Sequence, residues 1–341
     1  MFWFIPLAAS SVSEDSVQAS KPVSKNDTWY IAAEPDRLYR IDSTIYNLEE
    51  YNFVQRWGKE YLNTGNTGTA AYPIVFDHNT SVGFNAGFNQ FNLYRYHIDS
   101  IRYYRVIRPY AELSMILGLN NEQLFQGRFA HQVKNILFYG VDFTRIFSRG
   151  AYQNQRANDN GFNFYAIYNS KNKHWNVQAD FILNNNKVQE NGGVRADPFN
   201  GSYFQKKLVP VTVEKAENNY RQIDFHLKSS YNVGKRYYER KNDTTEVKTI
   251  LPIFKISHHL NIEQQTYRFL DASPDPDYYA SFFNQDTVSN RLQYLKTGNT
   301  IMLDLQPRKL TSDSTFIEKD FIAHAEAGYD YYFVKNNYAY D

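Results

Sequence analysis

The residue types that most often carry acid–base chemistry come together near the C-terminal end, where one residue separates His324 from Glu326. Residues two apart in a β-strand point to the same face, so this imidazole and carboxylate could exchange a proton. Catalysis would also need a nucleophile, and nothing in the spacing brings Ser114 or Ser257 to this pair. We therefore expect solvated polar side chains here and no enzymatic activity.

Two other groups have the residue types of metal ligands. His258 and His259 are adjacent, so in a strand they point to opposite faces and cannot share one ion without a bulge. Asp271, Asp275 and Asp277 are spaced like a loose calcium loop, but no glycine turn and no distal glutamate accompany them. A solvated surface loop is the expectation, and no metal site is predicted.

The elements that would position these side chains are β-strands, most clearly in a hairpin between Phe162 and Leu183. Its two arms alternate apolar and polar residues, and the turn between them, Asn169 to Lys173, is short and polar. Each arm has about the 9–11 residues that a tilted strand needs to cross a bilayer. The apolar positions are Phe162, Phe164, Ala166, Tyr168, Trp175, Val177, Ala179, Phe181 and Leu183.

The same alternation recurs in about nine arms, which predicts an all-β fold: an antiparallel transmembrane β-barrel. The other arms begin near Pro109, Gln123, Leu137, Ile223, Phe254, Ile301 and Phe321. Closed single-chain bacterial barrels have an even number of strands, and an unpaired edge in hydrocarbon is costly. We therefore expect an incomplete barrel, the N-terminal portion of a longer one.

Charge decides which face meets lipid, because a charge at the bilayer midplane costs about 2–4 kcal/mol when it faces lipid. The strand face that carries the charged residues should then line a lumen. Its candidate residues are Glu112, Arg128, Asp142, Asp180, Asp224, His226, Lys228, Lys255, Glu263, Asp304, His324, Glu326 and Asp330. The predicted lipid-facing residues are Leu113, Leu117, Val141, Phe143, Phe164, Val177, Phe181, Phe225, Leu227, Ile256, Leu303 and Ala325. Two exceptions fall on the lipid phase, Arg145 near a strand end and His258.

Composition agrees with a barrel. The chain of 341 residues holds 29 Tyr and 25 Phe, yet its mean hydropathy is -0.62 and it has no run of about 18 apolar residues for a membrane helix. A formal net charge of +1 gives no field that would attract nucleic acid. Zero cysteines exclude disulfides and thiolate chemistry.

The N-terminal part is organised differently. Residues 1–10 resemble the remnant of a signal peptide, and residues 11–28 a flexible arm. Residues 29–107 show no steady period, which predicts a periplasmic or plug segment before barrel strands at 108–341 with a long loop at 184–219. Within it, Gly65 to Thr69 lacks the following Lys-Ser/Thr of a phosphate-binding loop, so no cofactor is expected.

Several motifs resemble the family of large outer-membrane porins of Bacteroidota. They lie at residues 65–71, 108–113, 122–127, 139–146 and 190–194, and the resemblance is strongest over about residues 60–200. It implies a large β-barrel in the outer membrane, with members longer than this chain.

The sequence thus favours passive diffusion of small polar solutes through a charged lumen, with outer-membrane lipid and lipopolysaccharide as surroundings and a homo-oligomer or an envelope protein as possible partner. Acids outnumber bases among the lumen candidates, which predicts mild cation preference. Two alternatives remain: a non-conducting assembly barrel blocked by residues 29–77, and a soluble secreted β-protein.

Overall fold

The fold is a computed structural model, which describes residues 29–32, 38–40, 61–75, 84–106, 108–134, 136–195, 205–242, 245–279, 287–305, 308–310, 316–318 and 323–338. The predicted signal remnant and flexible arm, residues 1–28, lie outside these, as does Phe321. The described part is all-β apart from four single-turn 3₁₀ helices, η1 Asn92–Tyr94, η2 Ile98–Ser100, η3 Leu119–Asn121 and η4 Lys206–Leu208. None of the helices found in it is long and apolar enough to cross a membrane.

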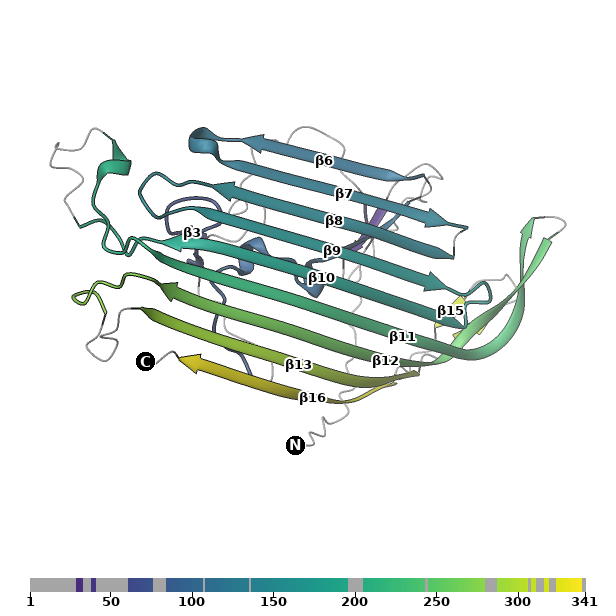
Figure 1. The fold of residues 1–341 in the computed structure, drawn as a ribbon. Coiled ribbons are helices and arrows are strands. Elements are labelled where there is room, and N and C mark those ends of the chain that lie inside the picture. Colours follow the sequence, from purple (N-terminus) through teal and green to yellow (C-terminus); the bar gives the residue numbers. More distant parts are fainter. Residues whose placement is uncertain are drawn as a thin grey trace.

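One nine-stranded antiparallel sheet dominates the molecule (Figure 1). The strand order is β16-β13-β12-β11-β10-β9-β8-β7-β6, so each strand pairs with the next strand in the chain except that β13 pairs with β16, past the separate pair β14 and β15. The strands are β6 Tyr110–Leu117, β7 Gln123–Val133, β8 Leu137–Ser148, β9 Ala157–Asn169, β10 Trp175–Glu190, β11 Ala216–Asn242, β12 Thr245–Asp271, β13 Val288–Leu305 and β16 Ala323–Tyr338. Among the described residues β6 does not pair with β16, so the sheet is a curved wall that is not closed, as an incomplete barrel would be.

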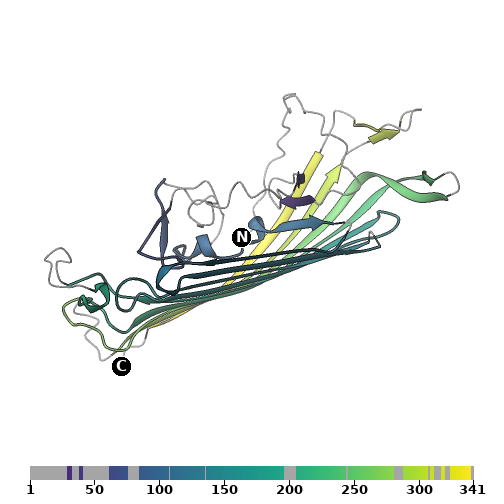
Figure 2. The ribbon, with the colours of Figure 1, turned by 90° about the horizontal axis from the view of Figure 1, so that it is seen from above.

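The smaller elements form three short sheets. They comprise β1 Trp29–Ala32, β2 Leu38–Arg40 and β5 Arg102–Arg105 in the first, β3 Tyr61–Asn63 and β4 Ala71–Pro73 in the second, and β14 Arg308–Leu310 and β15 Phe316–Glu318 in the third. The N-terminal elements all lie on one side of the large sheet (Figure 2). We call this side the inner face and the other the outer face.

The strand register carries single rows of residues across the whole wall. One outer row is Ala111, Phe129, Val141, Phe164, Phe181, Phe225, Ile262, Thr297 and Tyr331. The neighbouring inner row is Glu112, Arg128, Asp142, Asn163, Ile182, Asp224, Glu263, Lys296 and Tyr332. The predicted hairpin is confirmed in its register, since Phe164 pairs with Phe181 and Tyr168 with Val177.

The buried core lies between the inner face and residues 61–75 and 84–106, which we call the docked segment. One cluster joins Tyr103 and Val106 of the segment to Tyr165 and Ile182 of the wall. A second joins Phe91 to Tyr220 and Tyr267, and a third joins Tyr94 to Ile146. Such packing requires apolar side chains on parts of the inner face. This explains why some inward-pointing strand positions are apolar although most are polar or charged.

The predicted loop at residues 184–219 is wrong in its bounds. Strand β10 continues to Glu190 and β11 begins at Ala216, and residues 184–190 pair with residues 216–222. Here the outer face is polar, with Asn185 and Arg221, and the inner face mixes Asn184 and Gln222 with Val188 and Tyr220, so the alternation that marks a strand disappears although the strand persists. The hairpin of β11 and β12 also exceeds its prediction and projects past the ends of its neighbours (Figures 1 and 2).

Candidate functional site

The candidate site is the inner face together with the segment docked on it. The docked segment covers mainly strands β7 to β11, where the polar wall residues are nearly inaccessible: Asp142 is 4 % exposed, Asp180 2 % and Asp224 3 %. The aromatic residues Phe88 and Phe84 extend this contact by stacking on Tyr267 of β12 and Tyr294 of β13.

Residues Arg95 and Tyr96 hold the centre of the docked segment. The side-chain amide of Asn184 accepts from the Tyr96 N–H at 2.9 Å and donates to the Tyr96 carbonyl at 2.8 Å, as a paired strand would. The buried Arg95 guanidinium lies 4.1 Å from the centre of the Tyr220 ring and donates to Gln222 Oε1 at 3.0 Å. Burial together with the carboxylate of Asp142 raises the pKa of Tyr96 to about 12, so its hydroxyl stays neutral.

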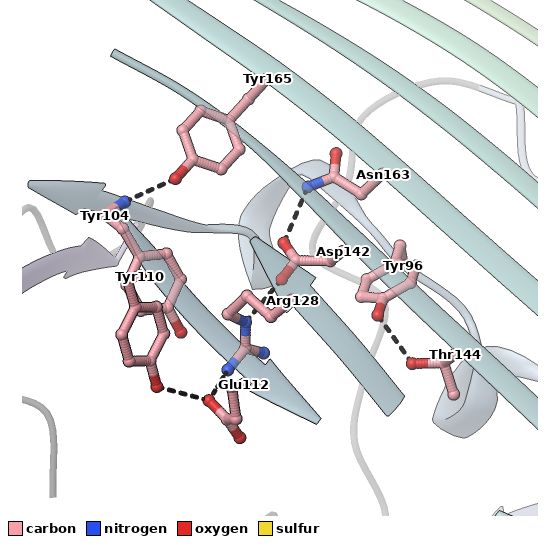
Figure 3. A network of polar contacts seen from close by, with 9 residues as sticks. All are labelled: Tyr96, Tyr104, Tyr110, Glu112, Arg128, Asp142, Thr144, Asn163 and Tyr165. Carbon is pink, nitrogen blue, oxygen red and sulfur yellow. Dashed lines mark hydrogen bonds and ion pairs between the residues drawn. The ribbon is translucent and has the colours of Figure 1, made fainter. Parts of the chain in front are cut away.

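An ionic network lies beside this anchor (Figure 3). Arg128 donates to Asp142 Oδ1 at 2.5 Å and to Glu112 Oε2 at 3.0 Å, so one cation on β7 joins carboxylates on both neighbouring strands. Asn163 donates to the second oxygen of Asp142 at 3.2 Å. The network thus satisfies charges that would be costly to bury alone.

Tyrosines fasten the segment to this network. Tyr104 of the segment stacks on Tyr110 of β6, whose hydroxyl donates to Glu112 at 2.7 Å, and the Tyr104 N–H donates to the Tyr165 hydroxyl at 2.9 Å. Tyr165 lies across Gly140 of the paired strand β8, where a Cβ atom would sit 2.5 Å from its ring. Gly140 therefore leaves the space that positions Tyr165 toward the segment.

The glycine stretch at residues 65–69 is a structural loop inserted against the wall. Asn66 donates to Ser148 Oγ at 2.9 Å and to the Gln155 carbonyl at 3.2 Å. Gly68 has φ +91°, and a Cβ there would lie 2.7 Å from Asp159 Oδ2. Close packing of backbone against the wall accounts for these glycines.

The inner face of β12, β13 and β16 is more open. Lys296 lies 3.7 Å from both Glu263 and Asp330. The His324 ring lies between Asp304, at 2.6 Å, and Glu326, at 3.6 Å. His324 and Glu326 do share a face, as their spacing predicts. Ser257 is buried on β12, with Met302 of β13 between it and Glu326, and Ser114 lies on β6 at the opposite edge of the sheet.

The register places the thirteen lumen candidates on the inner face and the twelve lipid-facing candidates on the outer face. Arg145 and His258 are exposed on the outer face, and His259 points inward. Sequence reasoning missed Lys296 and the wall amides Asn163, Asn184 and Gln222. Lys296 is two residues before Gly298, which interrupts the alternation of that strand. The amides lie on the same strand face as charged candidates, so the alternation could have identified them.

Metal chemistry finds no support in the described residues, which contain no group of three or more His, Cys, Asp or Glu able to hold an ion. In the aspartate loop, Asp271 accepts from Ser273 and Tyr279. Asp275 pairs with Arg195 and accepts from the Asp277 N–H at 2.9 Å. The carboxylates of Asp271 and Asp275 are thus engaged within the protein.

Comparison with known proteins gives one match, over most of the chain. The family described as "Putative porin" matches residues 26–340. Neither the search of curated proteins nor that of solved structures found a match.

Proposed function

This chain belongs to the family described as "Putative porin", and we propose that it lets small polar solutes diffuse passively through a charged lumen. The family consists in general of porin-like β-barrel proteins of the outer membrane.

The observation that carries the proposal is the inverted polarity of the wall. Outer residues Leu113 and Leu117 are 77 % and 67 % exposed, whereas inner Asp180 is 2 % exposed. A soluble protein hides its apolar side chains, so a continuous exposed apolar face of this size indicates contact with lipid. No second sheet or helix covers that face among the described residues (Figure 2).

The apolar band also has a suitable height. On the outer face of β11 the apolar band begins at Ile223 and ends at the aromatic Tyr231. Polar Arg221 borders it at one end, and the projecting part of the strand borders it at the other. The ten residue-to-residue steps from Arg221 to Tyr231 span roughly 33 Å along the strand, or about 25 Å across a membrane for a strand tilted by about 40°. This agrees with the height of the lipid-facing band in outer-membrane barrels.

The tightest turns and the longest connection lie at opposite ends of the strands and favour one orientation. Residues 134–136 and 170–174 are short turns at one end, which also carries the projecting β11–β12 hairpin and the connection 306–322. The other end carries the short connections 118–122 and 149–156 and the longer ones 191–215 and 272–287. Outer-membrane barrels keep short turns in the periplasm and long loops outside. Strand β6 begins at the short-turn end, so the docked segment enters the lumen from the periplasm in this orientation.

Solutes would pass along the part of the inner face that the segment leaves open, beside Glu263, Lys296, Asp304 and Asp330. Reconstitution of the full chain in liposomes should give a conductance with mild cation preference, because acids outnumber bases on the inner face. Anion preference, or no conductance, would reject the proposal.

A second candidate is a non-conducting barrel, favoured by the extent to which the docked segment buries the wall. Deleting residues 61–106 separates the two. Conductance should rise strongly if the segment blocks the lumen and stay unchanged if the path runs elsewhere. Migration of boiled and unboiled protein on detergent gels serves as the control that the barrel is still folded, and a soluble secreted protein would show no difference.

A further inference from the structure

Five basic side chains form a belt on the outer face, near the ends of the strands that carry the long loops. We call it the basic rim, and it consists of Arg145, Arg221, Arg268, Arg291 and Lys335. All five are exposed, and they come from β8, β11, β12, β13 and β16.

The strand register places the rim in two adjacent rows. The first row is Arg145, Asn160, Asn185, Arg221, Thr266, Gln293 and Lys335. The second is Asn158, Lys187, Asn219, Arg268, Arg291 and Asn337. Over β9 to β16 the other positions of these rows are amides and a threonine, which supply hydrogen-bond donors. On β6 to β8 the rows continue into Met115, Phe125, Leu117, Gln123 and Phe147, and neither row carries an acid.

The next row toward the middle of the sheet is almost wholly apolar. It consists of Phe143, Phe162, Leu183, Ile223, Gln264, Leu295 and Phe333. The basic rim therefore lies directly at the border of the band that would face lipid, which is the level of the headgroups.

The opposite border of the band is different. Its outer rows are Leu137, Tyr168, Val177, Ser229, His258, Ile301 and Ala327, and then Trp175, Tyr231, Ile256, Leu303 and Ala325. These positions contain aromatic residues but neither Arg nor Lys. On the strands themselves, Arg and Lys next to the apolar band thus occur at the long-loop end, whereas Lys134 and Lys171 at the other end lie in the turns beyond the strands.

Within the rim, like charges face each other without an acidic partner. Arg268 and Arg291 are directly opposite on β12 and β13, an arrangement that destabilises a sheet when nothing neutralises it. Among the described residues none of the five rim side chains forms an ion pair, whereas neighbouring Lys187 pairs with Glu217 at 3.1 Å. An anion supplied from outside the chain would neutralise these opposed arginines.

We propose that the basic rim binds the phosphate groups of lipid headgroups in the outer leaflet, as found in lipopolysaccharide. Arginine binds phosphate with paired charge-assisted hydrogen bonds, and the amides of the same rows add donors to the remaining oxygens. The lipid chains then continue along the apolar row that begins at Phe143 and Phe162. This inference depends on the proposed insertion in a membrane and on its orientation.

The test compares the full chain with the double variant R268Q/R291Q and with the control K134Q/K171Q, whose lysines lie in the short turns at the other end. Each protein is placed in detergent micelles with bisphosphorylated lipid A, with dephosphorylated lipid A, or with inorganic phosphate alone. Binding is measured by native mass spectrometry, and thermal unfolding is followed in parallel.

The wild type and the control should bind bisphosphorylated lipid A, and R268Q/R291Q should bind it about tenfold more weakly. The bound lipid should raise the unfolding temperature of the wild type more than that of the double variant. Without lipid the double variant should be at least as stable as the wild type, because a repulsion is removed. If the arginines instead stabilised the fold, the double variant would be less stable than the wild type without lipid.

Three results would overturn the proposal: equal binding by all three proteins, equal binding of dephosphorylated lipid, or equal stabilisation by inorganic phosphate alone. The last result would indicate a site for free anions. Boiled and unboiled gel migration is recorded for each protein, so a failure of the barrel proposal itself is distinguished from a failure of lipid binding.

Discussion

The side-chain amide of Asn184 brackets the peptide of Tyr96, accepting from its N–H at 2.9 Å and donating to its carbonyl at 2.8 Å. A wall side chain here replaces the neighbouring strand that this stretch of the docked segment lacks. Both peptide groups are partly buried, so loss of this one amide would leave them short of hydrogen bonds.

Replacing Asn184 with alanine should therefore loosen the docked segment without unfolding the wall. Each buried group left without a partner costs about 1–3 kcal/mol. Limited proteolysis of the refolded protein should cut the segment faster in Asn184→Ala. The neighbouring Asn185→Ala is the matched control, because Asn185 points outward. Equal cleavage of both variants would show that the hydrogen bonds from Asn184 to Tyr96 do not hold the segment.

Gly68→Ala should weaken the insertion of the glycine loop. The added Cβ would lie 2.7 Å from Asp159 Oδ2 and 2.9 Å from the Ala157 Cβ. Gly193 has nearly the same backbone, φ +92° against +91°, but has open space around it, so Gly193→Ala measures the cost of the backbone alone. Chemical denaturation should show a clearly larger loss for Gly68→Ala, and equal losses would exclude the packing argument.

Acid should release the docked segment through His97. Burial, aided by the charge of Arg95, lowers the pKa of His97 to about 3, below its ordinary value of 6.5. The undocked state then takes up a proton between these values, so the stabilisation is complete above about pH 6.5 and is lost as the pH falls toward 3. Hydrogen exchange of residues 84–106 at several pH values should show this loss, and His97→Gln should flatten the profile.

Lys296→Gln should increase cation preference in liposome conductance. The amine lies 3.7 Å from both Glu263 and Asp330, and its removal leaves these two carboxylates without their cation on the open part of the inner face. The reversal potential in a salt gradient measures the change. Lys335→Gln, on the outer face, removes the same charge and should leave the potential as in the wild type; a like shift in both variants would argue against a path past Lys296.

The phase of the strands was predictable because it depends only on a period of two and on the cost of charge in lipid. Phe164, Phe181 and Phe225 accordingly occupy one outer row. The ends of the strands were not predictable in this way, since near Asn184 and Arg221 the outer face is polar, the inner face is mixed and the alternation carries no signal.

Contacts of the docked segment escaped prediction for a different reason. Tyr96 and Asn184 are 88 residues apart, and Arg95 and Gln222 are 127 apart, so no local pattern relates them. A segment that packs on a polar wall also needs neither a period of two nor one of 3.6. Its aperiodicity allowed the prediction of a plug or periplasmic segment but gave no partners.

The central claim, that lipid lies outside the wall and water inside, is tested most directly at Ile262 and Glu263, adjacent residues on opposite faces of β12. The chain has no cysteine, so Ile262→Cys and Glu263→Cys can each carry a single spin label in the reconstituted protein. The label at residue 262 should collide with oxygen dissolved in lipid and resist a water-soluble nickel chelate, and the label at residue 263 should behave in the opposite way. Equal access of the nickel chelate to both positions would contradict the account.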